Sequence, residues 1–156
     1  MGNSLAELMN NVFDHAKSKI PGYTFTQLNT RSDTIITCVC DFGKGIPSTV
    51  NEYLVKKGSP RLSNDKALIK ALEHSFSTLT RPHNRGFGWN TIFSSLSLLK
   101  GKLLIVSNNA VFLKQTDGKV KSELISSNFP GTLVVITLNT RNLPEKEELS
   151  DELSLL

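Results

Sequence analysis

The stretch TIITCVCDFGKGIP, residues 34–47, changes from β-branched side chains to a bend that contains two glycines. β-Branched residues favour a strand, so Asp41, where the run ends, is expected at the rim of a sheet. A carboxylate there can accept a hydrogen bond from an exocyclic amine, and Gly43 and Gly45 would let the backbone approach a flat ring closely. The alternative is an ordinary turn that aspartate caps and glycine completes.

Cys38 and Cys40 lie two residues apart in this run, so both side chains are expected on one face of the strand. We expect buried, reduced thiols. A zinc site would need further ligands at recognisable spacing, whereas His15, His74 and His83 are scattered singly.

Asp41-Phe42-Gly43 also matches the metal-binding turn of protein kinases, but no His-Arg-Asp catalytic loop lies ahead of it. The chain has 156 residues, which suits one ordinary domain and leaves no room for a two-lobed kinase. We therefore expect a single domain over residues 1–140, followed by an acidic tail or short helix over residues 141–156.

The formal net charge of +4 is uneven, because residues 141–156 carry 2 basic and 5 acidic side chains. The rest of the chain is basic, which suits a polyanionic ligand; without a dense Lys/Arg run among aromatics, we expect a nucleotide phosphate rather than nucleic acid. Solvated surface charge is the alternative. Nothing resembles a signal peptide or a membrane span, so we expect a cytosolic protein with no membrane partner.

The order of elements predicts an α+β two-layer sandwich, with a mixed, mainly antiparallel sheet and helices on one face. Apolar periodicity predicts helices at residues 4–18, 64–76 and 89–99, the second of them inside a long loop over residues 48–83. β-Rich runs predict strands at residues 22–31, 34–40, 102–108, 110–115, 119–125 and 131–138. Turns are expected at Asn108-Asn109 and Asp117-Gly118.

Glu7, Asn11 and His15 recur every four residues, so they share one polar strip of the first predicted helix. Asn11 could give a carbonyl oxygen to Mg²⁺, which takes one or two protein ligands beside water and phosphates. Glu7 could then orient or deprotonate an attacking group. The alternative is a solvated helix face.

In RGFGWNTI, residues 85–92, two glycines stand directly before a predicted helix, where free backbone N–H groups bind anions. The stretch is neither a Walker loop nor a dinucleotide fingerprint. Nearby basic residues could meet phosphate oxygens or be surface charges; they are Lys56, Lys57, Arg61, Arg81 and Arg85.

The order ELMNNVFDHA, DFGKGI, long loop, NRGFGWNTI and GTLVVITL resembles the ATPase superfamily of histidine kinases, gyrase-type topoisomerases, mismatch-repair ATPases and the large heat-shock chaperone. The resemblance spans about residues 5–138. It implies a Bergerat-type ATP-binding fold, a two-layer sandwich, with ATP and Mg²⁺ as ligands. Trp89 departs from the Leu common in the family. The usual strand and helix ahead of the first motif are missing, so we expect either a fragment or a surface that a partner or the C-terminal segment covers.

The resemblance also implies roles for individual residues. Glu7 would be the general base, Asn11 the Mg²⁺ ligand, and Asp41, supported by Thr132, the acceptor for the adenine amine. The remaining residues implied at the nucleotide are His15, Gly43, Gly45, Ile46, Arg85, Gly86, Phe87 and Gly88.

Within the superfamily the chain looks most like stand-alone anti-sigma-factor serine kinases. That likeness implies transfer of the ATP γ-phosphoryl group to a hydroxyl of a regulatory protein partner, with homodimers as an open option. The alternatives are a non-catalytic module gated by ATP and the catalytic fragment of a histidine kinase, which would need a separate donor domain. A topoisomerase or repair ATPase is least favoured, because a transducer domain is missing.

Overall fold

The computed structural model describes residues 22–73 and 87–143. Their elements follow the order β1 (Tyr23–Asn29), β2 (Thr34–Asp41), α2 (Ile46–Lys56), α3 (Asn64–Leu72), α4 (Phe87–Leu98), β3 (Lys102–Lys114), β4 (Val120–Asn139) and the 3₁₀ turn η1 (Thr140–Asn142). The predicted helix at residues 4–18 lies outside the described residues.

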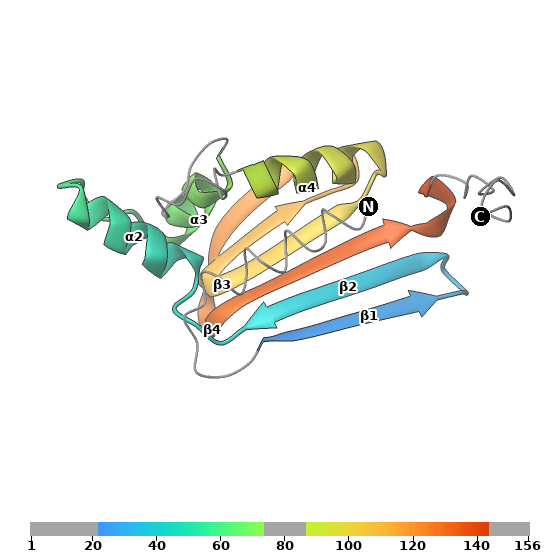
Figure 1. The fold of residues 1–156 in the computed structure, drawn as a ribbon, viewed down its shortest axis with the longest axis horizontal. Helices are drawn as coiled ribbons and strands as arrows, with labels where there is room; N and C mark the ends of the chain where they lie inside the picture. The colour runs from blue at the N-terminus through green and yellow to red at the C-terminus, as the bar shows by residue number, and fades with distance from the viewer. Residues whose placement is uncertain (1–21, 74–86, 144–156) are drawn as a thin grey trace, which may run out of the picture.

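The four strands form one sheet in the order β1-β2-β4-β3, with every neighbouring pair antiparallel (Figure 1). The predicted α+β class is therefore confirmed, and the described part of the sheet is antiparallel throughout. Both hairpins are local: β1 turns into β2, and β3 turns into β4 at the predicted Asp117-Gly118 turn.

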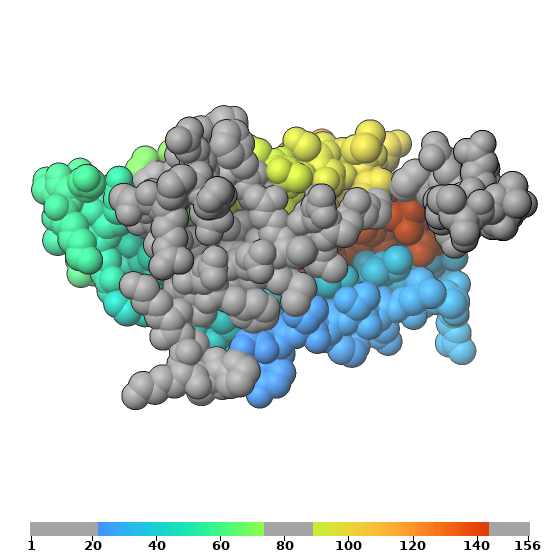
Figure 2. Space-filling view, in the orientation of Figure 1, coloured from blue at the N-terminus to red at the C-terminus, as the bar shows by residue number. Residues whose placement is uncertain are grey.

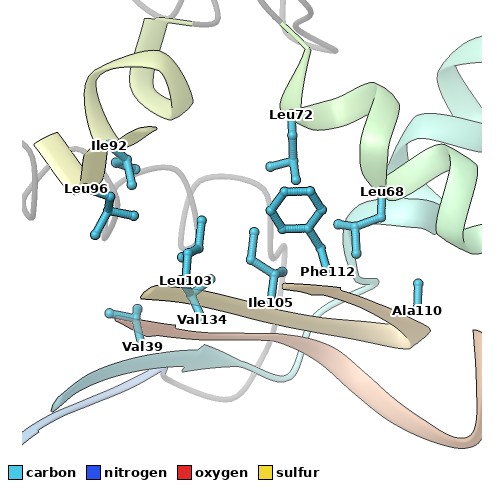
Figure 3. Close-up of a cluster of buried hydrophobic side chains, with 10 residues drawn as sticks. All are labelled: Val39, Leu68, Leu72, Ile92, Leu96, Leu103, Ile105, Ala110, Phe112 and Val134. Carbon is cyan, nitrogen blue, oxygen red and sulfur yellow. The ribbon is translucent and has the colours of Figure 1, made fainter. Parts of the chain in front are cut away.

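Helices α3 and α4 cover one face of the sheet, as Figure 3 shows. Leu68 of α3 and Leu96 of α4 face Val39, Ile105 and other strand residues in one buried cluster. This layer of apolar side chains stabilises the domain and fixes the height of the helices above the strands.

Two long strands replace the four predicted for residues 102–138. Asn108 has a positive φ of 52°, but it forms an irregularity inside β3 rather than a hairpin turn. Opposite it, β4 carries extra residues around Pro130, a position where proline is tolerated because the ladder is interrupted. The pairing with β4 resumes beyond the irregularity, so each strand continues as a single element.

The predicted long loop over residues 48–83 begins with a helix, α2, and the loop assignment is wrong there. Pro47 occupies the first turn, where its missing N–H costs nothing, and Gly58 follows the helix with a φ of 75°. Val50, in the middle of α2, is buried. The helix predicted at residues 64–76 is confirmed as α3, and the one at 89–99 as α4, which begins two residues earlier.

Cys38 and Cys40 are unbonded thiols on one face of β2, as the two-residue spacing predicts. The buried residues Thr37, Val39 and Asp41 alternate with them, so the thiols lie on the face away from α3 and α4. They are half-buried rather than buried, because no described helix covers that face.

Candidate functional site

Asp41 is the last residue of β2, and its side chain is only 2% exposed. The Gly43 N–H donates to Asp41 Oδ1 across 2.7 Å, and the Thr132 backbone N–H also donates to this carboxylate. Burial raises the pKa of Asp41, and these two hydrogen bonds lower it less, so the pKa lies above its ordinary value. The group is a buried acceptor whose desolvation is only partly compensated.

Thr132 lies directly opposite Asp41, because β2 and β4 pair these two residues in register. Its side chain is buried and lies within hydrogen-bonding distance of Ser107, 3.0 Å between the hydroxyl oxygens. Two residues that the sequence assigns to one site thus come from different hairpins and meet at the same end of the sheet.

Ser107 is a fully buried residue that the sequence did not single out. The Ile46 N–H donates to Ser107 Oγ across 2.8 Å, and the Ser107 hydroxyl donates to the Gly131 carbonyl, also across 2.8 Å. A serine hydroxyl has one proton, so Thr132 must donate to Ser107 in this arrangement. The lone pairs of Thr132 Oγ1 then remain available as acceptors beside Asp41.

Gly45 allows the bend after Asp41 to approach β3. Its φ is 79°, and a Cβ there would lie 2.7 Å from Asn108 Oδ1. Asn108 of β3 holds the bend through two hydrogen bonds: its Nδ2 donates to the Lys44 carbonyl, and its Oδ1 accepts from the Ser48 hydroxyl. Asn108 is therefore a second positioning residue, and the irregularity in β3 is what aims it at the bend.

Gly131 serves the same purpose on β4. Its φ is 110°, and a Cβ there would collide with the Asp41 carbonyl oxygen. Only glycine allows β4 to pass this close to the end of β2, so Gly131 sets the distance between Asp41 and Thr132.

The predicted site residues are brought together only in part. Asp41, Gly43, Gly45, Ile46 and Thr132 meet at this end of the sheet. Ile46 uses its N–H for Ser107 and packs its side chain against the core. Phe87 and Gly88 form the start of α4, so Gly88 lies inside the helix rather than before it. The remaining residues, Glu7, Asn11, His15, Arg85 and Gly86, lie outside the described residues.

The basic residues proposed for phosphate contacts are also divided. Lys56, Lys57 and Arg61 are exposed at the end of α2 and in the segment after it, whereas Arg81 is not among the described residues. Within residues 22–73 and 87–143, no group of three or more His, Cys, Asp or Glu side chains could hold a metal ion. None of the helices in these ranges is long and apolar enough to cross a membrane.

No protein-family model and no curated protein matches the chain. Among solved structures, it is similar to the ATPase and transducer domains of DNA topoisomerase II from Balamuthia mandrillaris, with a TM-score of 0.49 and 13% identity over 96% of this chain and 39% of that one. Two structures of the ATPase region of Saccharomyces cerevisiae topoisomerase II, one bound to dexrazoxane, give TM-scores of 0.47 and 0.48. Both are 13% identical over 88% of this chain and 37% of theirs.

The chain thus spans less than two fifths of each of these structures. Identity of 13% carries no information on activity. A ligand can therefore be inferred only from the chain's own residues.

Proposed function

We propose that this chain is an ATP-binding domain of the histidine kinase-like ATPase type, in which Asp41 and Thr132 bind the adenine amine. The observation that carries the proposal is the buried carboxylate of Asp41, paired in register with Thr132 at one end of the sheet. A carboxylate that is 2% exposed and only partly hydrogen-bonded gains from a further donor.

The chemistry of the acceptors favours adenine over guanine. Asp41 has lone pairs that the two backbone N–H groups do not use, and Thr132 Oγ1 adds further acceptors. Adenine carries an amine at position 6, which donates, whereas guanine carries a carbonyl oxygen there, which accepts. With position 6 turned toward Asp41, guanine would place an acceptor against acceptors; its own donors, N1–H and the 2-amino group, would reach Asp41 only with the base in a different orientation. In the proposed orientation ATP and ADP are therefore expected to bind and GTP is not.

Thermal unfolding with Mg²⁺ and ATP, ADP or GTP tests this assignment. A ligand at 100 times its Kd adds about 2.7 kcal/mol to the free energy of unfolding. We expect that stabilisation with ATP and ADP in the wild type, and its loss in Asp41→Asn, whose amide group replaces an acceptor with a donor. Asp117→Asn, a change in an exposed turn, is the matched control and should keep it. Equal stabilisation by GTP, or a full shift in Asp41→Asn, would contradict the assignment.

The phosphate end of the site belongs to the same proposal and rests on the motifs. Asn11 would hold Mg²⁺, with His15 beside it, and Arg85, Gly86, Phe87 and Gly88 would lie along the phosphates. Glu7 would act as general base for phosphoryl transfer to a hydroxyl of a regulatory protein.

Glu7→Ala separates catalysis from binding. Phosphoryl transfer should be lost while the ATP-dependent stabilisation persists. Unchanged transfer would rule out Glu7 as the base. ATP binding without transfer in any variant would instead indicate a module whose ATP-bound form controls a partner without chemistry.

A further inference from the structure

Strand β1 is the edge of the sheet. Among the described residues it pairs on one side only, with β2, and all seven of its residues are exposed. The exposed fractions of its large apolar side chains are 59% for Tyr23, 58% for Phe25 and 56% for Leu28. In the space-filling view the blue β1–β2 hairpin lies along the lower right margin (Figure 2).

This edge lacks the features that normally prevent strand addition. Exposed edge strands are usually protected by charged side chains, proline or bulges. Residues 22–30, GYTFTQLNT, contain no charged residue and no proline. The pairing with β2 also runs without a bulge from Tyr23 to Asn29. The outer backbone groups of β1 therefore form a regular template for another strand.

We propose that the edge pairs with β1 of a second copy of this chain, antiparallel, about a two-fold axis normal to the sheet. Such an isologous contact would join the described sheets of the two copies into one continuous sheet. With the axis at Thr26, all seven residues of β1 find partners: Phe25 faces Gln27 of the second copy, and Tyr23 faces Asn29. No like charges oppose each other, so β1 is complementary to itself.

The side chains support the same arrangement. Phe25 lies opposite Cys38 in the β1–β2 register, and Tyr23 lies opposite Cys40, so both aromatic rings are on the face that α3 and α4 leave open. A two-fold axis normal to the sheet keeps the open faces of both copies on one side. Phe25 and Phe25 of the second copy are then diagonal neighbours, a spacing that aromatic side chains can bridge.

The contact is small, because seven residue pairs bury less surface than a typical stable dimer does. We therefore expect a dimer that dissociates on dilution. Sedimentation equilibrium over a wide range of protein concentration should show wild-type monomers associating into dimers, and no larger species, because pairing consumes the edge.

A charge pair at position 25 tests the register. Phe25→Lys alone and Phe25→Glu alone should each be monomeric, because two like charges would meet diagonally. An equimolar mixture of the two variants should recover the dimer, because opposite charges then meet. Leu124→Lys, a similarly exposed strand position with an exposed fraction of 51%, is the matched control and should dimerise like the wild type.

Hydrogen exchange gives a second measurement that does not depend on a variant. Exchange of β1 amides should slow as the wild-type concentration rises, while exchange in α2 should stay constant. A wild type that is monomeric at every concentration would overturn the proposal and assign the edge to a strand from elsewhere. Dimerisation of either single-charge variant at wild-type strength, or a monomeric mixture, would overturn it as well.

Discussion

Ser107 joins three parts of the candidate site through one hydroxyl group: the bend at Ile46, the Gly131 carbonyl and Thr132. Ser107→Ala would leave the Ile46 N–H and the Thr132 hydroxyl without this partner in a fully buried place. Unsatisfied buried polar groups cost about 1–3 kcal/mol, so we expect a loss of that size in the free energy of unfolding, measured with urea.

Ser32→Ala is the control for this prediction, since Ser32 is exposed in the turn between β1 and β2 and its hydroxyl lies within hydrogen-bonding distance of Thr34 at the start of β2, at the protein surface. Its effect should stay within about 0.5 kcal/mol. Equal effects of the two substitutions would contradict the linking role of Ser107.

Single residues differ in how far the sequence reveals them. Asp41 could be predicted at the edge of the sheet because a β-branched run stops there. Thr132 could be predicted near the start of a strand because it follows a glycine that begins another β-branched run. Ser107 and Asn108 could not, since a serine at the end of an apolar run is ordinary and its three partners come from distant parts of the chain. The hydrogen bonds that position the site depend on tertiary pairing, which no local pattern encodes.

The bend between β2 and α2 needs glycine for two separate reasons, and Gly58 offers the means to separate them. Both Gly45 and Gly58 have positive φ, but only Gly45 has Asn108 against it; a Cβ at Gly58 would meet nothing within 4 Å. Gly58→Ala should cost roughly 1–2 kcal/mol through backbone strain alone. Gly45→Ala should cost more, because its Cβ would also displace Asn108.

Urea unfolding of the two variants measures the difference, which reports the collision with Asn108. Equal losses would mean that Asn108 moves aside freely. The bend would then be less firmly held by β3 than the hydrogen bonds of Asn108 indicate.

At the level of elements, the sequence pattern predicted β1, β2, α3 and α4, whose periodicity or composition is unbroken. The sequence pattern gave the wrong element where the same residues are compatible with two different structures. Asn108-Asn109 suits a hairpin turn and equally an irregularity in a strand, and only the pairing of β3 with β4 decides between them. The sequence of α2 has a proline at the start of the helix and a glycine after its end, but the many polar residues between them led to the prediction of a loop.

The free energy of unfolding of the whole domain should depend on pH through the ionisation of Asp41. Because its pKa is raised in the folded state, the folded domain takes up this proton at higher pH than the unfolded chain does. The resulting contribution is fully present below the ordinary aspartate pKa and is lost as pH rises through the raised value. The free energy of unfolding of the wild type, relative to Asp41→Asn, should therefore fall across that window.

Urea unfolding of both proteins at a series of pH values measures this difference. Contributions from other groups, such as the exposed Asp117 with its lowered pKa, cancel between the two proteins. A difference that does not vary with pH would mean that Asp41 titrates alike in the folded and unfolded states.

The order of the strands has a further consequence, for the assembly of the domain. Each hairpin closes a short loop, but β2 and β4 join residues about ninety positions apart, Asp41 and Thr132 among them. Closing a long loop costs more chain entropy than closing a short one, so each hairpin can form before the other is in reach. Asp41 belongs to the β1–β2 hairpin and Thr132 to the β3–β4 hairpin, so neither hairpin alone contains the complete candidate site. Asp41 and Thr132 therefore come together only when the two hairpins pair, and among the strands of residues 22–73 and 87–143 no other pairing joins positions so far apart in sequence. If ATP binds there as proposed, it binds only molecules in which both hairpins have docked.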